Sequence, residues 1–242
     1  MDLNQNELSI AVVTVNLNNV NGLIKTINSL INQTDKKFEF IIIDGGSTDG
    51  SFKIIEKYKK HIDYWVSEID KGVYNAMNKG LEKVTSDYCL FLNSGDYLYD
   101  EKTLEKVKQQ ITKGVPLIYG SIKWEDSNII WNPKKDLKAF EMTTKSVIPH
   151  QGAFFNTLFL KKLNGYKENF KVISDWGIML EIIGLGCKTQ KLDQIISICE
   201  KQGISAKFEY KIKKERLVYL LKYDFKNLIL GILYQIKKII LK

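Results

Sequence analysis

The sequence has little cysteine, proline and arginine. Its 242 residues include three Cys and three Pro, and Arg216 is its one arginine. The Cys residues lie far apart and form no C-x-x-C pair, which argues against a disulfide framework or a Cys-rich zinc site and favours a reducing cytosol. Because proteins read DNA bases largely through arginine forks, a chain with one arginine is a poor candidate for binding nucleic acid.

Long apolar stretches are also missing. No stretch reaches about 18 uncharged apolar residues, so we expect no membrane-spanning helix. The polar N-terminal segment MDLNQNELS is not typical of a signal peptide. The composition, 44% hydrophobic and 26% charged, is that of a globular protein, and no linker rich in Gly, Pro or Ser divides it. We therefore expect one domain over residues 1–206, followed by a tail.

The tail, residues 207–242, carries most of the net charge. It holds ten Lys and Arg and three Asp and Glu, which leaves +7 of the chain's +8 in this segment. Apolar residues such as Val218 and Phe225 recur every three or four positions with Lys between them, which predicts a long basic amphipathic helix. Such a helix suits an anionic membrane surface. The alternatives are packing on its own domain or on a second subunit of a homo-oligomer.

Strands and helices alternate through residues 1–112. Short β-branched or aromatic runs predict buried strands at 8–15, 38–43, 64–67 and 88–92, with helical periodicity between them. This alternation indicates an α/β fold with a mainly parallel sheet and helices on both faces.

The pattern changes in residues 113–206. Strands are expected at 117–124, 128–131 and 189–199, and a helix at 173–183. We interpret this half as a mixed extension of the same sheet that receives a second substrate.

Polar or small residues follow each of the four strands of the first half. In open α/β sheets, ligands bind beyond the carboxyl ends of the strands, so four polar ends at one edge indicate a polar crevice. Glycines at two of them let a ligand approach the backbone closely. The four groups are Thr14-Val15-Asn16, Asp44-Gly45-Gly46, Glu68-Ile69-Asp70 and Asn93-Ser94-Gly95-Asp96.

Carboxylates are frequent at this edge, and they would repel a phosphate unless a cation lay between. Magnesium and manganese prefer oxygen ligands and commonly bridge carboxylates to substrate phosphates. Lys71 and Lys79 are the nearby residues that could contact a phosphate directly. No G-x-G-x-x-G follows the first strand and no G-x-x-x-x-G-K-[ST] occurs, which disfavours dinucleotide oxidoreductases and P-loop NTPases. The pattern indicates a nucleoside diphosphate held by a metal and Lys.

From Leu8 to about Asp100 the chain resembles the family 2 glycosyltransferases, which have the GT-A (Rossmann-like) fold. The motifs that carry the resemblance are SIAVVTVN, FIIIDGGSTDGS, SEIDKGVYNAMNKG and YCLFLNSGD, and the second half adds HQG and SDWG more weakly. The resemblance is closest to bacterial transferases that build capsule, exopolysaccharide or O-antigen chains. It implies an inverting transfer of a sugar from a nucleotide donor, a UDP-sugar above all, to a glycan or lipid-linked acceptor. The implied location is cytoplasmic, peripheral on the inner face of the cell membrane.

The resemblance also implies roles on the donor side. Thr14, Val15 and Asn16 would line the nucleoside pocket. Asp44 would accept the imide hydrogen of uracil. The whole set expected to bind the nucleotide sugar is Thr14, Val15, Asn16, Asp44, Gly46, Asp70, Lys71, Lys79, Asn93, Ser94, Gly95 and Asp96.

The catalytic and metal roles follow from the later motifs. The segment Asn93–Asp96 stands where the family has its metal-binding D-x-D motif, and Asp175 stands where it has the catalytic base. We expect Mn²⁺ or Mg²⁺ at Asp96, together with His150. Two residues depart from the family pattern, since Asn93 replaces the first acidic residue of D-x-D and Met77 stands where many relatives have Arg.

Several of these residues also have a structural explanation. Asp44 and Asp49 could cap the helix after the second strand, and Asp175 could be the N-cap of its own helix. Asp96 could be a plain turn residue, and His150 a structural histidine.

Two other functions stay open for the whole chain. One is a catalytically silent nucleotide-binding scaffold, which the Asn93 departure keeps open. The other is a sugar nucleotidyltransferase, which is disfavoured because the segment 16–22 lacks the basic residue that such enzymes carry in a Gly-rich loop.

Overall fold

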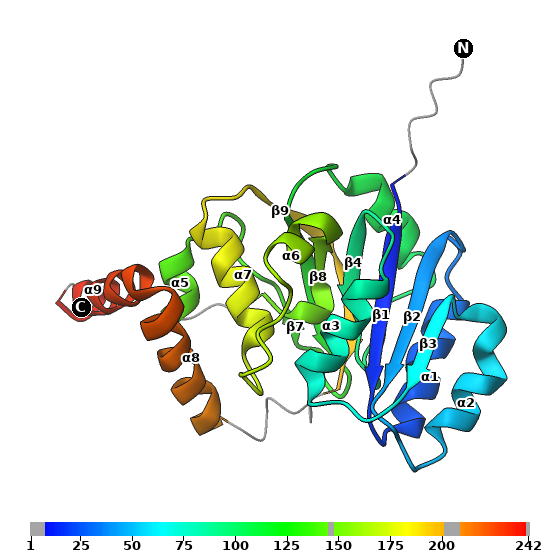
Figure 1. Cartoon of the computed structure of the whole chain (residues 1–242). Coiled ribbons are helices and arrows are strands. Elements are labelled where there is room, and N and C mark those ends of the chain that lie inside the picture. The colour runs from blue at the N-terminus through cyan, green and yellow to red at the C-terminus, as the bar shows by residue number, and fades with distance from the viewer. Residues whose placement is uncertain (1–7, 145–147, 201–208, 241–242) are drawn as a thin grey trace.

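The computed structural model describes residues 8–144, 148–200 and 209–240 (Figure 1). Its centre is a mixed sheet in the order β3-β2-β1-β4-β8-β6-β9-β5, with β7 paired to β6. The first half of the chain alternates strand and helix as the sequence predicts. Its elements are β1 (Ile10–Asn16), α1 (Val20–Ile31), β2 (Phe38–Asp44), α2 (Ser51–Tyr58), β3 (Tyr64–Ser67), α3 (Val73–Lys83) and β4 (Tyr88–Phe91).

In this half β3, β2, β1 and β4 are parallel neighbours, so their carboxyl ends meet at one edge. We call this edge the rim. All seven residues of β1 are buried, which is why its sequence is apolar on both faces. Ile10 and Val12 pack toward α1, whereas Ala11 and Val13 pack toward α3.

The second half extends the sheet with strands of both directions. β8 (Ala153–Asn156) is antiparallel to β4 and to β6 (Leu117–Trp124), and β9 (Thr189–Cys199) is parallel to β6. The mixed extension expected from the sequence is therefore confirmed. The remaining elements of this half are β5 (Tyr97–Leu98), α4 (Thr103–Gln110), β7 (Ile130–Trp131), α5 (Ala139–Thr144), α6 (Thr157–Lys162), α7 (Ser174–Gly184) and the short 3-10 helices Lys59–His61 and His150–Gly152.

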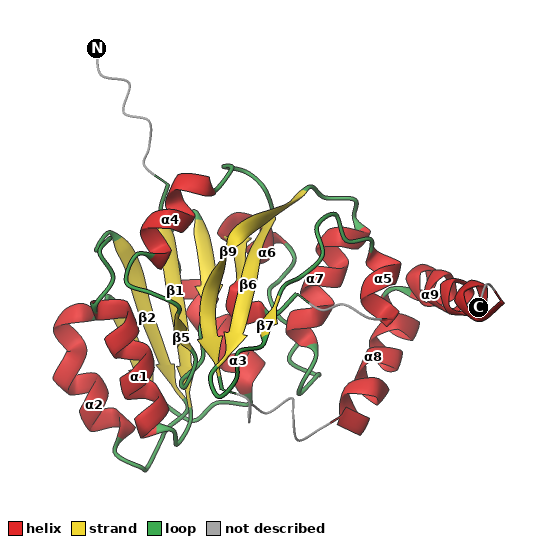
Figure 2. Cartoon of the chain, turned by 180° about the vertical axis from the view of Figure 1, so that it is seen from behind, coloured by secondary structure: helices red, strands yellow, loops and turns green. Residues whose placement is uncertain are grey.

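Helices cover both faces of the sheet. Figure 1 shows α3, α6 and α7 on the near face, and the reverse view in Figure 2 shows α1, α2 and α4 on the other. Each face encloses its own buried apolar cluster. The sheet and its two helical layers hold the rim in place, so side chains that follow the strands have fixed positions.

The C-terminal tail forms two helices rather than one. α8 (Glu209–Tyr223) and α9 (Phe225–Ile240) are separated by Asp224, which belongs to neither helix. The Asp224 carboxylate accepts hydrogen bonds from the Asn227 backbone and side chain, which caps the new helix. The sequence pattern missed this break because apolar spacing continues through it.

α8 packs on the domain, and α9 packs against α5. Tyr219 and Leu220 are buried, whereas Leu217, Val218 and Leu221 are 44–54% exposed. None of the helices among the described residues is long and apolar enough to cross a membrane.

Candidate active site

A cavity of about 410 Å³ lies at the rim. It brings together the ends of β1 and β4, the start of α3, the 3-10 helix before β8, the start of α7 and the end of β9. Of the residues predicted from the sequence, it is lined by Val15, Asn16, Asp70, Asn93, Ser94, Asp96, His150 and Asp175. Thr14, Asp44, Gly46, Lys71, Lys79 and Gly95 are not among its lining residues.

Asp44 lies beneath the rim and is fully buried. Its carboxylate accepts hydrogen bonds from Asn16 Nδ2 at 2.7 Å, from Ser67 Oγ at 2.6 Å and from both the backbone and the hydroxyl of Ser47. Burial acts to raise the pKa of Asp44, but these hydrogen bonds bring it below its usual value. α2 has Gly50 as its N-cap, so Asp44 is not the cap of that helix. Asp44 instead ties β1, β2 and β3 together below the cavity.

Asp49 has a structural role at the start of the helix that follows β2, as the sequence allowed. Its carboxylate accepts from the Ser51 backbone and hydroxyl at the start of α2, and from the Val20 backbone at the start of α1. It links the two helices and does not line the cavity.

Lys79 is paired with acidic residues. Its Nζ lies 2.5 Å from Asp70 Oδ1 and 2.7 Å from Glu68 Oε1. The carboxylates outweigh the effect of burial and raise the pKa of Lys79. We expected the positive charge of Lys79 to contact a diphosphate, but two carboxylates of the protein already neutralise it. Lys71 lies on the exposed turn before α3, where its backbone N–H donates to Asn75.

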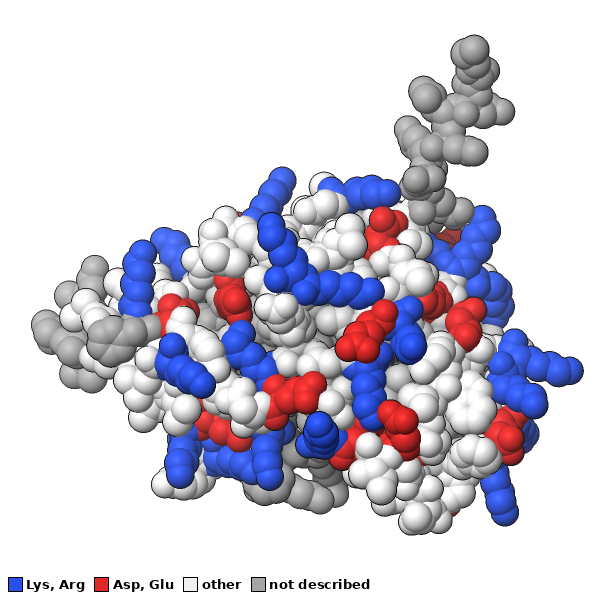
Figure 3. Space-filling model, viewed as in Figure 1, with Lys and Arg blue, Asp and Glu red and all other residues white. Residues whose placement is uncertain are grey.

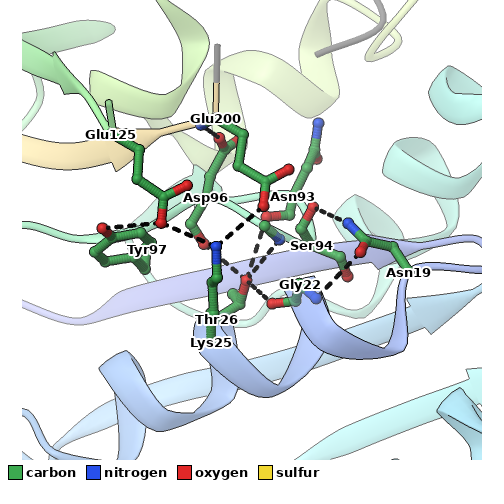
Figure 4. A network of polar contacts seen from close by, with 11 residues as sticks. Asn19, Gly22, Lys25, Thr26, Asn93, Ser94, Asp96, Tyr97, Glu125 and Glu200 are labelled. Atoms are coloured by element: carbon green, nitrogen blue, oxygen red, sulfur yellow. Dashed lines mark hydrogen bonds and ion pairs between the residues drawn. The ribbon is translucent and has the colours of Figure 1, made fainter. Parts of the chain in front are cut away.

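The loop Asn93–Asp96 is fixed from below by α1 (Figure 4). Thr26 Oγ1 donates to the Asp96 carbonyl at 2.7 Å and accepts from the Gly95 N–H at 3.1 Å. Asn19 Nδ2 donates to the Ser94 carbonyl at 3.0 Å. Gly95 has φ of +104° and lies against the Glu200 carboxylate, so a side chain would be strained and crowded there. Asn19 and Thr26 carry no sequence signal for this role, because α1 and the loop are about 70 residues apart.

Asp96 points into the site from a nearly buried position. Its side chain accepts from Gln151 Nε2 and from the Glu200 backbone, both at 3.2 Å. Burial raises the pKa of Asp96 to about 6. Beside the cavity, Lys25 Nζ lies 2.9 Å from Glu125 and 3.4 Å from Glu200, which holds Glu200 over the loop (Figure 4).

His150 and Asp175 form a pair on the opposite wall. His150 Nδ1 lies 2.9 Å from Asp175 Oδ2, and the Tyr74 hydroxyl donates to Asp175 Oδ1 at 2.8 Å. Burial acts to raise the pKa of Asp175, but these partners lower it, so the carboxylate stays ionised. The N-cap of α7 is Ile173, so the N-cap interpretation of Asp175 is wrong. His150 Nε2 faces the Asn93 amide at 3.4 Å, on the side of Asp96.

The donor atoms here fit a divalent cation that keeps substrate or water ligands. The described residues contain no cluster of three or more His, Cys, Asp and Glu that could hold a metal alone. Asn93 Oδ1 and Ser94 Oγ are buried without a hydrogen-bond partner among those residues. Such uncommitted oxygens beside Asp96 and His150 Nε2 suit Mg²⁺ or Mn²⁺, which often take only one or two carboxylates from the protein.

Several other lining residues were not predicted from the sequence. Among them are Tyr74, Gln151, Lys171 and Glu200. Gln151 is the middle residue of HQG and Lys171 lies three residues before SDWG, but only the folded chain shows which residues in or near a motif face the cavity.

Comparison with known proteins agrees with this architecture. A family model, Glycosyl transferase family 2, matches residues 9–173. A PGL/p-HBAD biosynthesis glycosyltransferase of Mycobacterium bovis is 31% identical over 173 residues, which cover 69% of this chain and 66% of that protein.

Solved structures share the fold. The crystal structure of S. aureus TarS superposes with a TM-score of 0.71 at 19% identity, covering 91% of this chain and 41% of TarS. A mannosyltransferase from Pyrobaculum calidifontis, in complex with GDP-Man and Mn²⁺, gives a TM-score of 0.65 at 17% identity over 88% of this chain and 63% of that one. This chain therefore spans only part of the length of these proteins, and the matches confirm the GT-A-like α/β fold. The chain belongs to glycosyl transferase family 2.

Proposed function

We propose that this protein transfers a sugar from a UDP-sugar to a hydroxyl of a glycan or lipid-linked acceptor in the synthesis of bacterial surface polysaccharide. The observation that carries the proposal is the cavity itself. It joins the polar ends of β1 and β4 to an ionised carboxylate, Asp175, on the opposite wall. Structures of TarS with UDP and with UDP-GlcNAc have the same fold, and the mycobacterial relative is named for PGL/p-HBAD biosynthesis.

On the donor side, the nucleoside would lie over the end of β1. Val15 and Asn16 line the cavity there, with Thr14 directly beneath. Gly45 is held close to the Asp70 carboxylate and to Leu17, so a larger residue would narrow this end. Asp44 would act through Asn16, whose amide it fixes, or receive the uracil imide after its network rearranges.

Asp175 is the proposed base. A carboxylate has about four lone-pair positions, and the hydrogen bonds from Tyr74 and His150 occupy two of them. A free lone pair can therefore accept the proton of the attacking hydroxyl as the new bond forms. With the base on the face opposite the leaving diphosphate, the displacement inverts the anomeric carbon.

Asp96 and His150 are the proposed protein ligands of Mn²⁺ or Mg²⁺, with Asn93 and Ser94 beside them. When bound, such a cation neutralises charge on the leaving nucleoside diphosphate. The protein's part is to keep Asp96 in place, which it does through the Gln151 side chain and the Glu200 backbone. His150 must be neutral to ligate, and its contact with Asp175 directs Nε2 toward the loop.

The arm formed by α8 and α9 is the proposed membrane contact. Apolar side chains of both helices are exposed, among them Leu221, Ile232 and Leu233, and Lys222 and Lys226 are exposed near them. Over the face of the whole molecule that Figure 3 draws, Lys and Arg side chains are spread with acidic ones between them. An anionic cytoplasmic leaflet would bind both the apolar and the lysine side chains of the arm and bring a lipid-linked acceptor to the rim.

The test is incubation of the protein with a panel of UDP- and GDP-sugars, with and without Mn²⁺, and detection of the released nucleotide. We expect release from one UDP-sugar, dependence on Mn²⁺, and loss of release in Asp175→Asn. Release of UDP that is unchanged in Asp175→Asn would contradict the role of the base. No release from any donor, together with tight UDP binding, would favour the scaffold.

A further inference from the structure

The positive charge of the cavity comes from an unexpected residue. Asp70, Asp96, Asp175 and Glu200 all line the cavity, and Lys171 is the one Lys or Arg among its described lining residues. A diphosphate entering such a site meets four carboxylates, so a cation that faces it has a large effect on binding.

The ion pairs near the rim leave Lys171 uncommitted. Lys79 is bound by Asp70 and Glu68, and Lys25 is bound by Glu125 and Glu200. Among the described residues, no carboxylate lies within ion-pair distance of Lys171 Nζ. Its ammonium makes no hydrogen bond to the described residues either, so toward that part of the chain its donors are available to a ligand.

The backbone at Lys171 and Val172 is fixed by a residue that lies outside the region matched by the family model. The Glu215 carboxylate of α8 accepts from the Lys171 N–H at 3.1 Å and from the Val172 N–H at 3.0 Å. Residue 215 lies beyond residue 173, where the family model ends. α8 thus stabilises the part of the cavity wall formed by Lys171 and Val172.

Two more contacts join α8 to the same segment. The Tyr219 hydroxyl donates to the Gly177 carbonyl at 3.0 Å, and the Arg216 guanidinium lies 4.9 Å from the centre of the Trp176 ring. Lys171 and Asp175 lie within this fixed stretch, so α8 sets the position of both.

We propose that Lys171 binds the diphosphate of the donor and stabilises it as the leaving group, and that Glu215 is a positioning residue for Lys171. This deepens the proposed function and rests on it. The role replaces the one that Lys79 was expected to have. It also makes α8 part of the active site rather than only a surface element.

The experiment measures binding of UDP and of uridine to the full chain by isothermal titration calorimetry in the presence of Mn²⁺. Uridine lacks the diphosphate, so it reports on the nucleoside pocket alone. Lys171→Met should weaken UDP binding by about tenfold to a hundredfold, the usual range for a hydrogen bond to a charged group. Uridine binding should change less than about twofold on the same basis, and Lys171→Arg should retain most of the UDP affinity.

Glu215→Ala should weaken UDP binding about three- to tenfold and leave uridine binding unchanged. The loss is smaller than in Lys171→Met because the contact between Lys171 and the diphosphate is loosened and not removed. Lys162→Met is the matched control, since Lys162 is exposed on α6 and does not line the cavity.

The outcomes separate the two proposals. Equal UDP affinity in Lys171→Met and the wild type would overturn the role of Lys171, and an equal loss for UDP and uridine would overturn it as well, by showing a distorted pocket. Wild-type UDP affinity in Glu215→Ala would overturn the positioning role. A wild-type chain that binds no UDP would overturn the proposed function and this inference together.

Discussion

Gly177 is the point at which α8 rests on α7. A Cβ atom at this position would lie 2.4 Å from Cε2 and 2.7 Å from Cζ of Tyr219. Tyr219 is buried between Phe170 and Trp176, with ring centroids 5.3 and 5.8 Å away, so it has no room to withdraw. Gly177→Ala must therefore push α8 outward or force Tyr219 out of its preferred rotamer.

The expected cost follows from three effects. Overpacking costs about 1–3 kcal/mol. Loss of the hydrogen bond from Tyr219 to the Gly177 carbonyl adds about 1 kcal/mol, and the better helix propensity of Ala returns about the same amount. The free energy of unfolding should thus fall by about 1–3 kcal/mol, which lowers Tm by about 2–12 °C for a chain of this size.

The assay is thermal unfolding followed by circular dichroism, with Gly184→Ala as the matched control. Gly184 is in the same helix, but its nearest neighbour would be 3.6 Å from the added Cβ, an ordinary contact. Gly184→Ala should leave Tm unchanged or raise it. In a Tyr219→Ala background, Gly177→Ala should cost nothing further. Equal Tm values for Gly177→Ala and Gly184→Ala would refute the account of this interface.

The remaining predictions concern the cavity and the arm. Asp175→Asn should lower turnover about 10²–10⁴-fold with UDP affinity within about twofold by calorimetry, and a matching loss of UDP affinity would contradict a role confined to proton transfer. Asp96→Asn should raise the metal-free free energy of unfolding at pH 7.5 by roughly 1–2 kcal/mol, because burial penalises the charged form, and should remove any rise of Tm caused by Mn²⁺. A Tm that still rises with Mn²⁺ in this variant would place the cation elsewhere. Deletion of residues 225–242 should abolish flotation with phosphatidylglycerol vesicles and leave UDP binding unchanged; flotation equal to that of the full chain would exclude α9 as the membrane contact.

The sequence predicted the first half of the fold, residues 1–112, well because the signals there are local. We call this part the donor half. β1 and β4 are buried along their whole length and β2 over its last five residues, so each appears as a mainly apolar run followed by a polar end. The rim follows directly, since parallel strands bring those ends together. The predicted residues Asn16 and Asp96 line one cavity for this reason.

What the sequence could not predict depends on contacts between distant segments. Lys79 appeared free, but the turn before α3 places Asp70 and Glu68 against it. Lys171 was not singled out from the sequence, and only the packing of α8 shows that its backbone is fixed. The break at Asp224 was hidden because a short interruption leaves the apolar period almost unchanged.

The reversed direction of β8 determines which parts of this protein can vary independently. Because β8 runs opposite to β4, it enters the sheet from the rim, and His150 lies beside Asn93 just before the strand begins. The strands of the donor half leave the sheet at the same edge. Segments that precede β8 can therefore change in length or composition while β1 to β4 keep their register. The residues most open to such change are 126–131, which are mostly exposed, whereas Leu137, Met142 and Ile148 of the same segment are buried in the core.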